Sequence, residues 1–253
     1  MQSASRYLLR FLATLGAVSF TSPAFTGPPA YATEKLQTTH VEAARAVLDP
    51  GCHLPDSAAL SRIVQLRGDN GGHASSVVIR PNLLLTVAHA LAGEERVYAE
   101  IDGILQLVTP LVINETRDLA LLAVDTRELQ PIPISDRPLL DNERVWAIGF
   151  PLGRAQRTSH GVVTERADGS LYTTAHINQG TSGGGLLRCA DGQANKYELA
   201  GIVRAYIADI SSDEPINTGD SVAVGKAAII DILDIAERSR FSLATNHSQV
   251  EFH

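Results

Sequence analysis

From residue 61 to about residue 127, apolar positions recur in short runs that are separated by turn-forming Gly, Pro, Asn and Asp. Short runs rich in β-branched residues, with no helical pattern between them, are typical of antiparallel strands. They predict a small six-stranded barrel over residues 61–127. The predicted strands are 63–66, 75–79, 83–87, 96–101, 104–108 and 119–124.

A proline-rich stretch, residues 129–138, interrupts this pattern and predicts a linker. A second series of apolar runs follows over residues 142–225 and predicts a second six-stranded antiparallel barrel. Both barrels belong to one all-β domain that we place at 61–241. The predicted strands of the second barrel are 144–148, 156–164, 171–177, 184–187, 199–207 and 221–224.

Helical spacing occurs at the two ends of the chain beyond residue 32. Residues 40–48 predict a short helix within an N-terminal segment, 33–60, and the sequence leaves open whether that segment is a removable pro-segment. Residues 226–238 predict a C-terminal helix, because Ile229, Ile230, Leu233 and Ala236 recur at helical spacing. The polar residues 242–253 predict a flexible tail.

The first 32 residues have a basic start, an apolar run over 11–20 and a small-residue ending at Ala32. This is the layout of a secretory signal peptide. The apolar run is about half as long as a membrane-spanning helix, so a permanent anchor is the weaker interpretation. We expect cleavage after Ala32, with Ala24 as the alternative, and export to the periplasm or the extracellular space, between which the sequence does not choose.

The charge balance argues against nucleic acid as a partner. The chain has 21 Lys and Arg against 28 Asp and Glu, a net charge of −7. Loss of residues 1–32 removes Arg6 and Arg10 and no acid, which leaves 19 basic residues and a net charge of about −9. With 44% hydrophobic residues and no later run of about 20 apolar residues, a soluble globular protein is expected.

The only two cysteines are Cys52 and Cys189. An exported protein enters an oxidising compartment, so a disulfide between them is expected. It would stabilise the protein chiefly by restricting the unfolded chain. The alternative is two unpaired thiols.

The candidate chemistry centres on Ser182, which glycines surround in the stretch 178–185. Glycine allows tight turns and close substrate approach, so Ser182 could be an exposed nucleophile, although Gly-rich turns are also common without function. His89 follows an apolar strand and Asp118 precedes one. A serine hydroxyl needs an imidazole to take its proton and a carboxylate to orient that imidazole, and this chain has all three residue types.

The strings around these three residues resemble the trypsin-like, chymotrypsin-fold serine proteases. The matching strings are Val87-Ala88-His89, Asp118-Leu119-Ala120-Leu121 and Gly180-Thr181-Ser182-Gly183-Gly184. The stretch 145–153 and Ser159-His160-Gly161-Val162-Val163 also look like the start of the second barrel in bacterial HtrA-type proteases, although the peptide-binding domain of HtrA proteins is not recognisable after it. The resemblance covers about 61–235 and implies a chymotrypsin-like fold and a His89, Asp118, Ser182 triad.

The resemblance also implies that the main-chain N–H groups of Gly180 and Ser182 form an oxyanion hole. A different family, the α/β-hydrolases, shares the pattern Gly-x-Ser-x-Gly. That fold needs a helix after the serine and an acid and a histidine later in the chain. Here Gly183-Gly184-Gly185 is a poor helix start, and the only later histidines are His247 and His253 in the polar tail.

Thr181 departs from the digestive members of the family, in which an aspartate before the serine pairs with a new N-terminus. Arg62-Ile63-Val64 superficially resembles the cleavage site that would create such an end. Because the partner aspartate is absent, we expect that no Ile63 amine is needed for activity.

The family resemblance also suggests which residues line the substrate pocket. His176 lies six residues before Ser182, where trypsin-like specificity for Arg or Lys requires an aspartate. The strand expected to pair with substrate includes Arg204 and Tyr206, where small residues are usual. His176 with Arg204 could favour an acidic substrate side chain, and the alternative is a pocket for small apolar residues.

The sequence contains no His-Glu-x-x-His motif and no paired Cys spacing, so no metal and no cofactor are expected. The expected partner is a protein or peptide substrate, and the oligomeric state is left open. A secreted serine endopeptidase that works through an acyl-enzyme is thus expected. The alternative is a catalytically impaired binding protein that keeps the protease fold.

Overall fold

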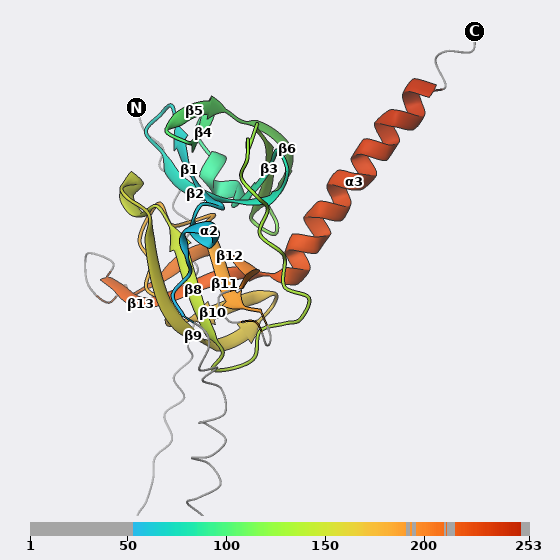
Figure 1. Ribbon diagram of the computed structural model, residues 1–253. Coiled ribbons are helices and arrows are strands. Elements are labelled where there is room, and N and C mark those ends of the chain that lie inside the picture. Colours follow the sequence, from blue (N-terminus) through green and yellow to red (C-terminus); the bar gives the residue numbers. More distant parts are fainter. Residues whose placement is uncertain (1–52, 191–192, 194–195, 210, 212–215, 249–253) are drawn as a thin grey trace, which may run out of the picture. The chain divides into compact units, whose positions relative to one another are not determined.

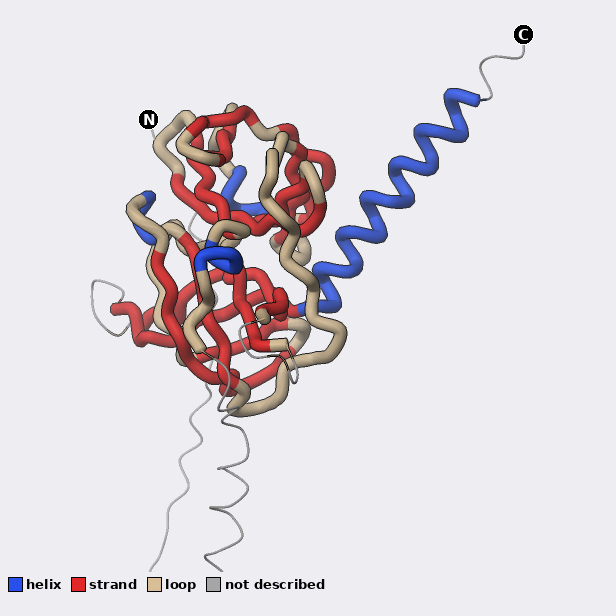
Figure 2. Tube along the Cα trace, viewed as in Figure 1, coloured by secondary structure: helices blue, strands red, loops and turns tan. Residues whose placement is uncertain are grey.

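The computed structural model describes residues 53–190, 193, 196–209, 211 and 216–248. Strands dominate these residues (Figures 1 and 2). The predicted signal peptide, the predicted helix 40–48 and Cys52 lie outside the described residues.

The first half of the described chain is a seven-stranded antiparallel sheet of order β5-β4-β1-β2-β3-β7-β6. Strands β5 and β6 are joined by Val108 alone, yet they lie at opposite edges of the sheet. The sheet therefore curls round on itself. The predicted count of six strands was wrong, because β6 is a seventh. The strands of this sheet are β1 Ile63–Gly68, β2 His73–Arg80, β3 Leu83–Thr86, β4 Val97–Ile101, β5 Ile104–Leu107, β6 Thr109–Asn114 and β7 Leu119–Ala123.

The second half is a closed six-stranded barrel of order β10-β13-β12-β11-β8-β9, as predicted. Short helices precede β1 and follow β3 and β8: α2 Ser57–Leu60, η1 Ala88–Leu91 and η2 Pro151–Gly153. The strands of the barrel are β8 Arg144–Gly149, β9 Arg157–Ala167, β10 Ser170–Thr173, β11 Gly185–Cys189, β12 Tyr197–Asp209 and β13 Ile216–Gly225.

Alternate residues of the central strands face different apolar clusters, because side chains alternate across a strand. In β2, Val78 lies inside the first sheet while Val77 packs in a cluster shared by both halves. In β8, Ala147 lies inside the second barrel while Trp146 faces the shared cluster. The shared cluster therefore joins the two halves around the region where the candidate residues lie.

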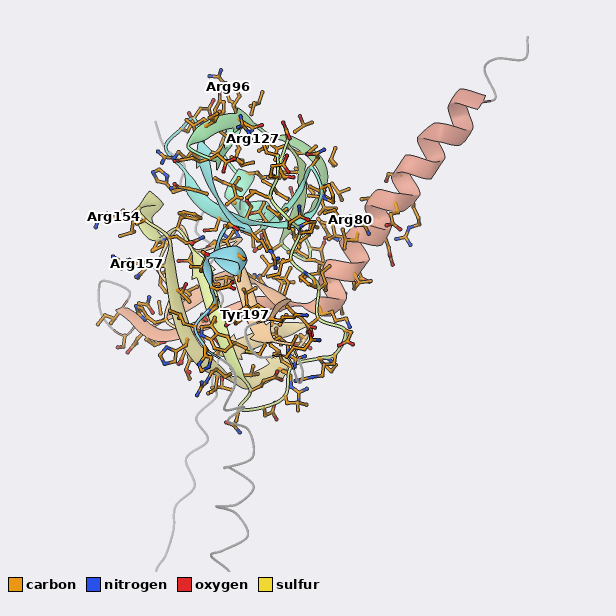
Figure 3. The ribbon with its side chains drawn as sticks, viewed as in Figure 1. Arg80, Arg96, Arg127, Arg154, Arg157 and Tyr197 are labelled. Carbon is orange, nitrogen blue, oxygen red and sulfur yellow. The ribbon has the colours of Figure 1, made fainter. Side chains whose placement is uncertain are left out.

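The C-terminal helix α3, Lys226–Ser248, adds Ile229, Ile232 and Leu233 to the shared cluster. Its early turns lie against β6, β7, β12 and β13, and the rest runs away from the strands (Figure 1). Arg80 of β2, labelled in Figure 3, forms an ion pair of 2.8 Å with Glu237 of this helix. The helix ends at Ser248, beyond the predicted end at residue 238, because no Gly or Pro interrupts the polar residues that follow.

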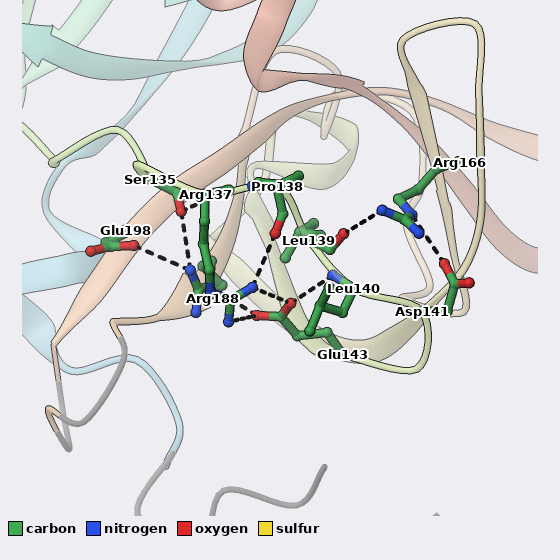
Figure 4. Close-up of polar contacts among 10 residues, drawn as sticks. All are labelled: Ser135, Arg137, Pro138, Leu139, Leu140, Asp141, Glu143, Arg166, Arg188 and Glu198. Atoms are coloured by element: carbon green, nitrogen blue, oxygen red, sulfur yellow. Dashed lines mark hydrogen bonds and ion pairs between the residues drawn. The ribbon is translucent and has the colours of Figure 1, made fainter.

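The predicted linker is bonded to both halves. The N–H of Ile132 donates to Val78 of β2, and the N–H of Leu199 in β12 donates to Pro133. Beside it, Arg188 of β11 is almost fully buried and its Nε lies 2.9 Å from Glu143 Oε1 (Figure 4). A buried guanidinium needs such partners, and Arg188 Nη1 also donates to Ser135 Oγ at 3.2 Å and lies 3.6 Å from Glu198 Oε2. Arg137 binds the same Glu143 carboxylate.

Candidate active site

The pairing of β3 with β7 brings His89 and Asp118 together. The two strands are antiparallel, with Thr86 opposite Ala120, so the end of β3 lies beside the start of β7. His89 follows β3 in η1, and Asp118 immediately precedes β7. Asp118 has a φ of 54°, a left-handed conformation that aspartate tolerates better than most residues.

The Asp118 carboxylate holds His89 at two places. The His89 ring Nδ1 lies 2.9 Å from Oδ2 and 3.1 Å from Oδ1, and the His89 main-chain N–H donates to Oδ1 at 3.0 Å. The carboxylate is mostly covered, with 14% of its side chain exposed, whereas 49% of the imidazole is exposed. With Nδ1 occupied, the other ring nitrogen, Nε2, is the one available for proton transfer.

The electrostatic surroundings keep Asp118 ionised. Burial by itself raises the pKa of Asp118, but the hydrogen bonds and charge of His89, together with the charge of Arg204, outweigh burial and lower it below 3.8. Hydrogen bonds to the charged form and a nearby cation both favour a carboxylate over the neutral acid. At neutral pH Asp118 is therefore an acceptor that orients the ring.

Ser182 lies on a tight loop before β11, and the loop is pinned at several points. The Ser75 N–H of β2 donates to the Ser182 carbonyl at 2.8 Å, and the Gly183 N–H donates to Val203 at 2.7 Å. Gly183 has a φ of 85°, and a Cβ there would lie 2.1 Å from the Ser75 carbonyl oxygen. Only glycine fits at that position, because any side chain would collide with a backbone atom.

The orientation of Gly180 follows from the bond of its neighbour. The Leu152 N–H donates to the Gln179 carbonyl at 2.7 Å, and because the peptide is trans, the Gly180 N–H points the opposite way. Within the described residues, neither this N–H nor that of Ser182 has a hydrogen-bond partner. Both donors are free to bind a developing negative charge.

Ser75 supports this loop and was missed by sequence reasoning. It is fully buried, and its Oγ donates to the Gly180 carbonyl at 2.7 Å and accepts from the Phe150 N–H at 2.9 Å. Its own carbonyl accepts from Thr86 Oγ1 at 2.7 Å. The only sequence signal was the polar pair Ser75-Ser76 inside an otherwise apolar strand.

The Ser182 hydroxyl donates to the main-chain carbonyl of Arg204 at 3.1 Å. The Arg204 side chain turns to Asp118, with Nε 3.3 Å from Oδ2. Arg204 thus contacts both Ser182 and Asp118, an arrangement that the sequence did not suggest.

Comparison with known proteins identifies the kind of domain. Residues 74–194 match the family model described as the trypsin-like peptidase domain, and that range contains His89, Asp118 and Ser182. Over residues 74–194 the chain is thus similar to trypsin-like peptidase domains. No curated protein sequence matches the chain.

Solved structures share the fold of this chain. A serine endoprotease from Yersinia pestis is 23% identical with a TM-score of 0.60, over 74% of this chain and 68% of that one. The HtrA-type protease AlgW, solved with a tripeptide, is 24% identical with a TM-score of 0.61, over 72% of this chain and 64% of its own. The Rv3671c protease from M. tuberculosis H37Rv is 19% identical with a TM-score of 0.58, over 74% of this chain and 96% of that one.

These comparisons confirm the predicted chymotrypsin-like fold and the predicted resemblance to trypsin-like proteases. Together with the family match they support a serine-type endopeptidase. The chain spans less than two thirds of AlgW, so AlgW's further properties are not carried over.

In the structure, the three predicted pocket residues have different surroundings. His176 is exposed on the segment after β10, and its Nδ1 would lie 3.7 Å from a Cβ on Gly219. Tyr206 is half-buried and packs on the apolar interior of the second barrel. Arg204 reaches Asp118, so a shared contact of His176 and Arg204 with substrate stays a prediction.

Ile63 is the first residue of β1, where it is buried and pairs with Val77. Its carbonyl accepts from Gln156 Nε2 at 3.2 Å. This supports its interpretation as a strand residue, and independence from an Ile63 amine stays a prediction.

Proposed function

We propose that this chain is an exported serine endopeptidase in which Ser182 is the nucleophile, His89 the general base and then acid, and Asp118 the residue that orients His89. The observation that carries the proposal is the Asp118 carboxylate on His89 Nδ1, beside a serine loop whose Gly180 and Ser182 N–H groups are unengaged. Each role needs the residue type that stands there.

In the proposed reaction, Ser182 Oγ attacks the peptide carbonyl carbon while its proton passes to His89 Nε2. The oxyanion is bound by the two N–H groups, a preorganised interaction that is worth about 3 kcal/mol for each donor. His89 then gives the proton to the leaving nitrogen as the C–N bond breaks, which leaves an acyl-enzyme. Water then attacks the ester carbonyl carbon while His89 takes its proton. The bond between this carbon and Ser182 Oγ breaks, His89 returns the proton to Oγ, and the carboxylic acid product leaves.

The Ser182 hydroxyl must first leave the Arg204 carbonyl. Rotation about its Cα–Cβ bond takes the hydroxyl to another staggered position, away from that carbonyl. The present bond to Arg204 instead of His89 is also the observation that favours the alternative, a catalytically impaired binding protein of the same fold.

Labelling by a fluorophosphonate probe separates the two candidates. The wild-type protein should be labelled at Ser182, found by peptide mass analysis, and the Ser182→Ala variant should not. Equal labelling of the wild type and of Ser182→Ala would contradict the nucleophile, and a folded protein without label would favour the binding protein.

Export is part of the proposal and rests on the signal-peptide layout of residues 1–32. None of the helices in the described part of the chain is long and apolar enough to cross a membrane. N-terminal sequencing of the secreted or periplasmic protein should begin at Thr33. A protein that keeps Met1 and stays inside the cell would contradict export.

A further inference from the structure

Arg204 contacts two of the three proposed catalytic residues with different parts of itself. Its main-chain carbonyl accepts from Ser182 Oγ, and its Nε lies 3.3 Å from Asp118 Oδ2. The same Oδ2 accepts from His89 Nδ1. A guanidinium has five N–H donors in a rigid fork, and the contact with Asp118 uses only the Nε edge.

The outer end of the fork is open. Across the described residues, neither terminal Nη nitrogen of Arg204 has a hydrogen-bond or ion-pair partner, and the side chain is 43% exposed. Because Asp118 holds Nε, the Arg204 side chain is already partly ordered. It therefore loses less conformational entropy when a carboxylate binds its Nη atoms than an unpaired arginine side chain would lose. The fork therefore suits a carboxylate that arrives beside Ser182.

The charge of Arg204 also decides whether an acidic substrate is tolerated. Asp118 is ionised, and the whole chain carries a net charge of −7, so a substrate carboxylate near the triad would otherwise be repelled. A cation between Asp118 and the substrate offsets that repulsion. This arrangement strengthens the binding of acidic substrate side chains most, and it does not strengthen the binding of neutral ones.

We propose that Arg204 binds a carboxylate side chain of the substrate while its Nε stays on Asp118, so that the enzyme prefers Asp or Glu at one of the two positions before the cleaved bond. This inference rests on the proposed endopeptidase function. Arg204 is then a specificity-determining residue that also touches the triad.

The test compares peptide pairs that differ only by Glu or Gln at either position, with kcat/KM measured for each. The wild type should cleave the Glu peptide at least about tenfold faster at one position, since charge-assisted bonds are roughly twice as strong as neutral ones. Arg204→Gln should lower that ratio to about one or below. Arg204→Lys keeps the charge without the fork and should give an intermediate ratio.

Arg80→Gln is the matched control, because Arg80 is also half-exposed and paired with a carboxylate, Glu237, but no described contact joins its side chain to His89, Asp118 or Ser182. It should keep the wild-type ratio. A thermal melt of every variant shows whether it is folded. If Arg204→Gln is not folded, the comparison of the wild type with Arg204→Lys tests the proposal.

The outcomes separate this inference from the function on which it rests. Wild-type protein that is labelled by the fluorophosphonate but shows no Glu preference overturns the role of Arg204 and leaves the peptidase standing. A Glu preference that survives in Arg204→Gln also overturns it and moves recognition elsewhere, with His176 the first residue to substitute. Protein that is neither labelled nor active overturns both.

Discussion

Ser75 illustrates how a single buried hydroxyl can shape the candidate site. Its Oγ joins the Gly180 carbonyl to the Phe150 N–H, and its N–H holds the Ser182 carbonyl. The residue therefore fixes the loop that presents the two free N–H donors. It contacts no substrate in the proposed reaction and acts through the loop.

Ser75→Ala should reduce kcat by about tenfold to a hundredfold, because the part-buried Phe150 N–H loses its partner and the oxyanion donors shift. KM should change little. Steady-state kinetics measures both. Ser76→Ala is the control, since the neighbouring Ser76 is equally buried but its Oγ donates to Val64 on the first sheet. If both variants lose kcat equally, Ser75 has no special effect on the site.

Asp118 should also make stability depend on pH. Its folded pKa is held below the unfolded value of 3.8, so it stabilises the folded state above that value, and the stabilisation is lost as the pH falls through the folded pKa. Thermal melts of wild type and Asp118→Asn should differ by a few degrees at neutral pH. The difference should shrink below about pH 4, and a gap that is constant with pH would argue against the ion pairs described for Asp118.

At the scale of elements, the central strands were predictable because they are buried on both faces. Leu83, Leu84 and Leu85 form a continuous apolar run whose members face different clusters. Strand β6 was missed because Pro110 indicates a break. It is tolerated there, since β6 is an edge strand and the register shifts between Pro110 and Val112.

Helix α3 should be required for the stability of both halves, because its buried face completes their shared cluster. Ile232 is fully buried, so Ile232→Ala should lower the free energy of unfolding by about 2–5 kcal/mol. Ile230→Ala, at a 38% exposed position of the same helix, should cost about 1 kcal/mol or less. Chemical denaturation measures both, and equal effects would mean that α3 does not pack as described.

At the scale of the whole molecule, the pairing of Cys52 with Cys189 stays a prediction, because Cys52 lies outside the described residues. Geometry next to it supports the bond. Tyr197, which is opposite Cys189 in the β11–β12 pairing, donates its hydroxyl to the carbonyl of His53 at 3.0 Å. His53 follows Cys52 in the sequence, and no described cysteine is a free thiol.

Removing the predicted bond should destabilise the protein. The free energy of unfolding of the double variant Cys52→Ser, Cys189→Ser should be about 2–4 kcal/mol lower than that of the wild type, because the unfolded chain gains conformational freedom. Mass analysis of an unreduced digest should find the two cysteine peptides linked. Full alkylation of both cysteines in unreduced, unfolded protein would contradict the pairing.

The sequence by itself determined the two series of strands and the C-terminal helix, and it predicted His89, Asp118 and Ser182 as candidates, because local patterns of apolar residues and short motifs carry that information. Only the tertiary structure decided which groups meet. Ser75 and Arg204 lie far in sequence from their partners, Gly180 and Asp118, and strand pairing sets those contacts. A side chain's direction depends on its packing neighbours, so Arg204, predicted as a pocket residue, could be placed on Asp118 only by the folded chain.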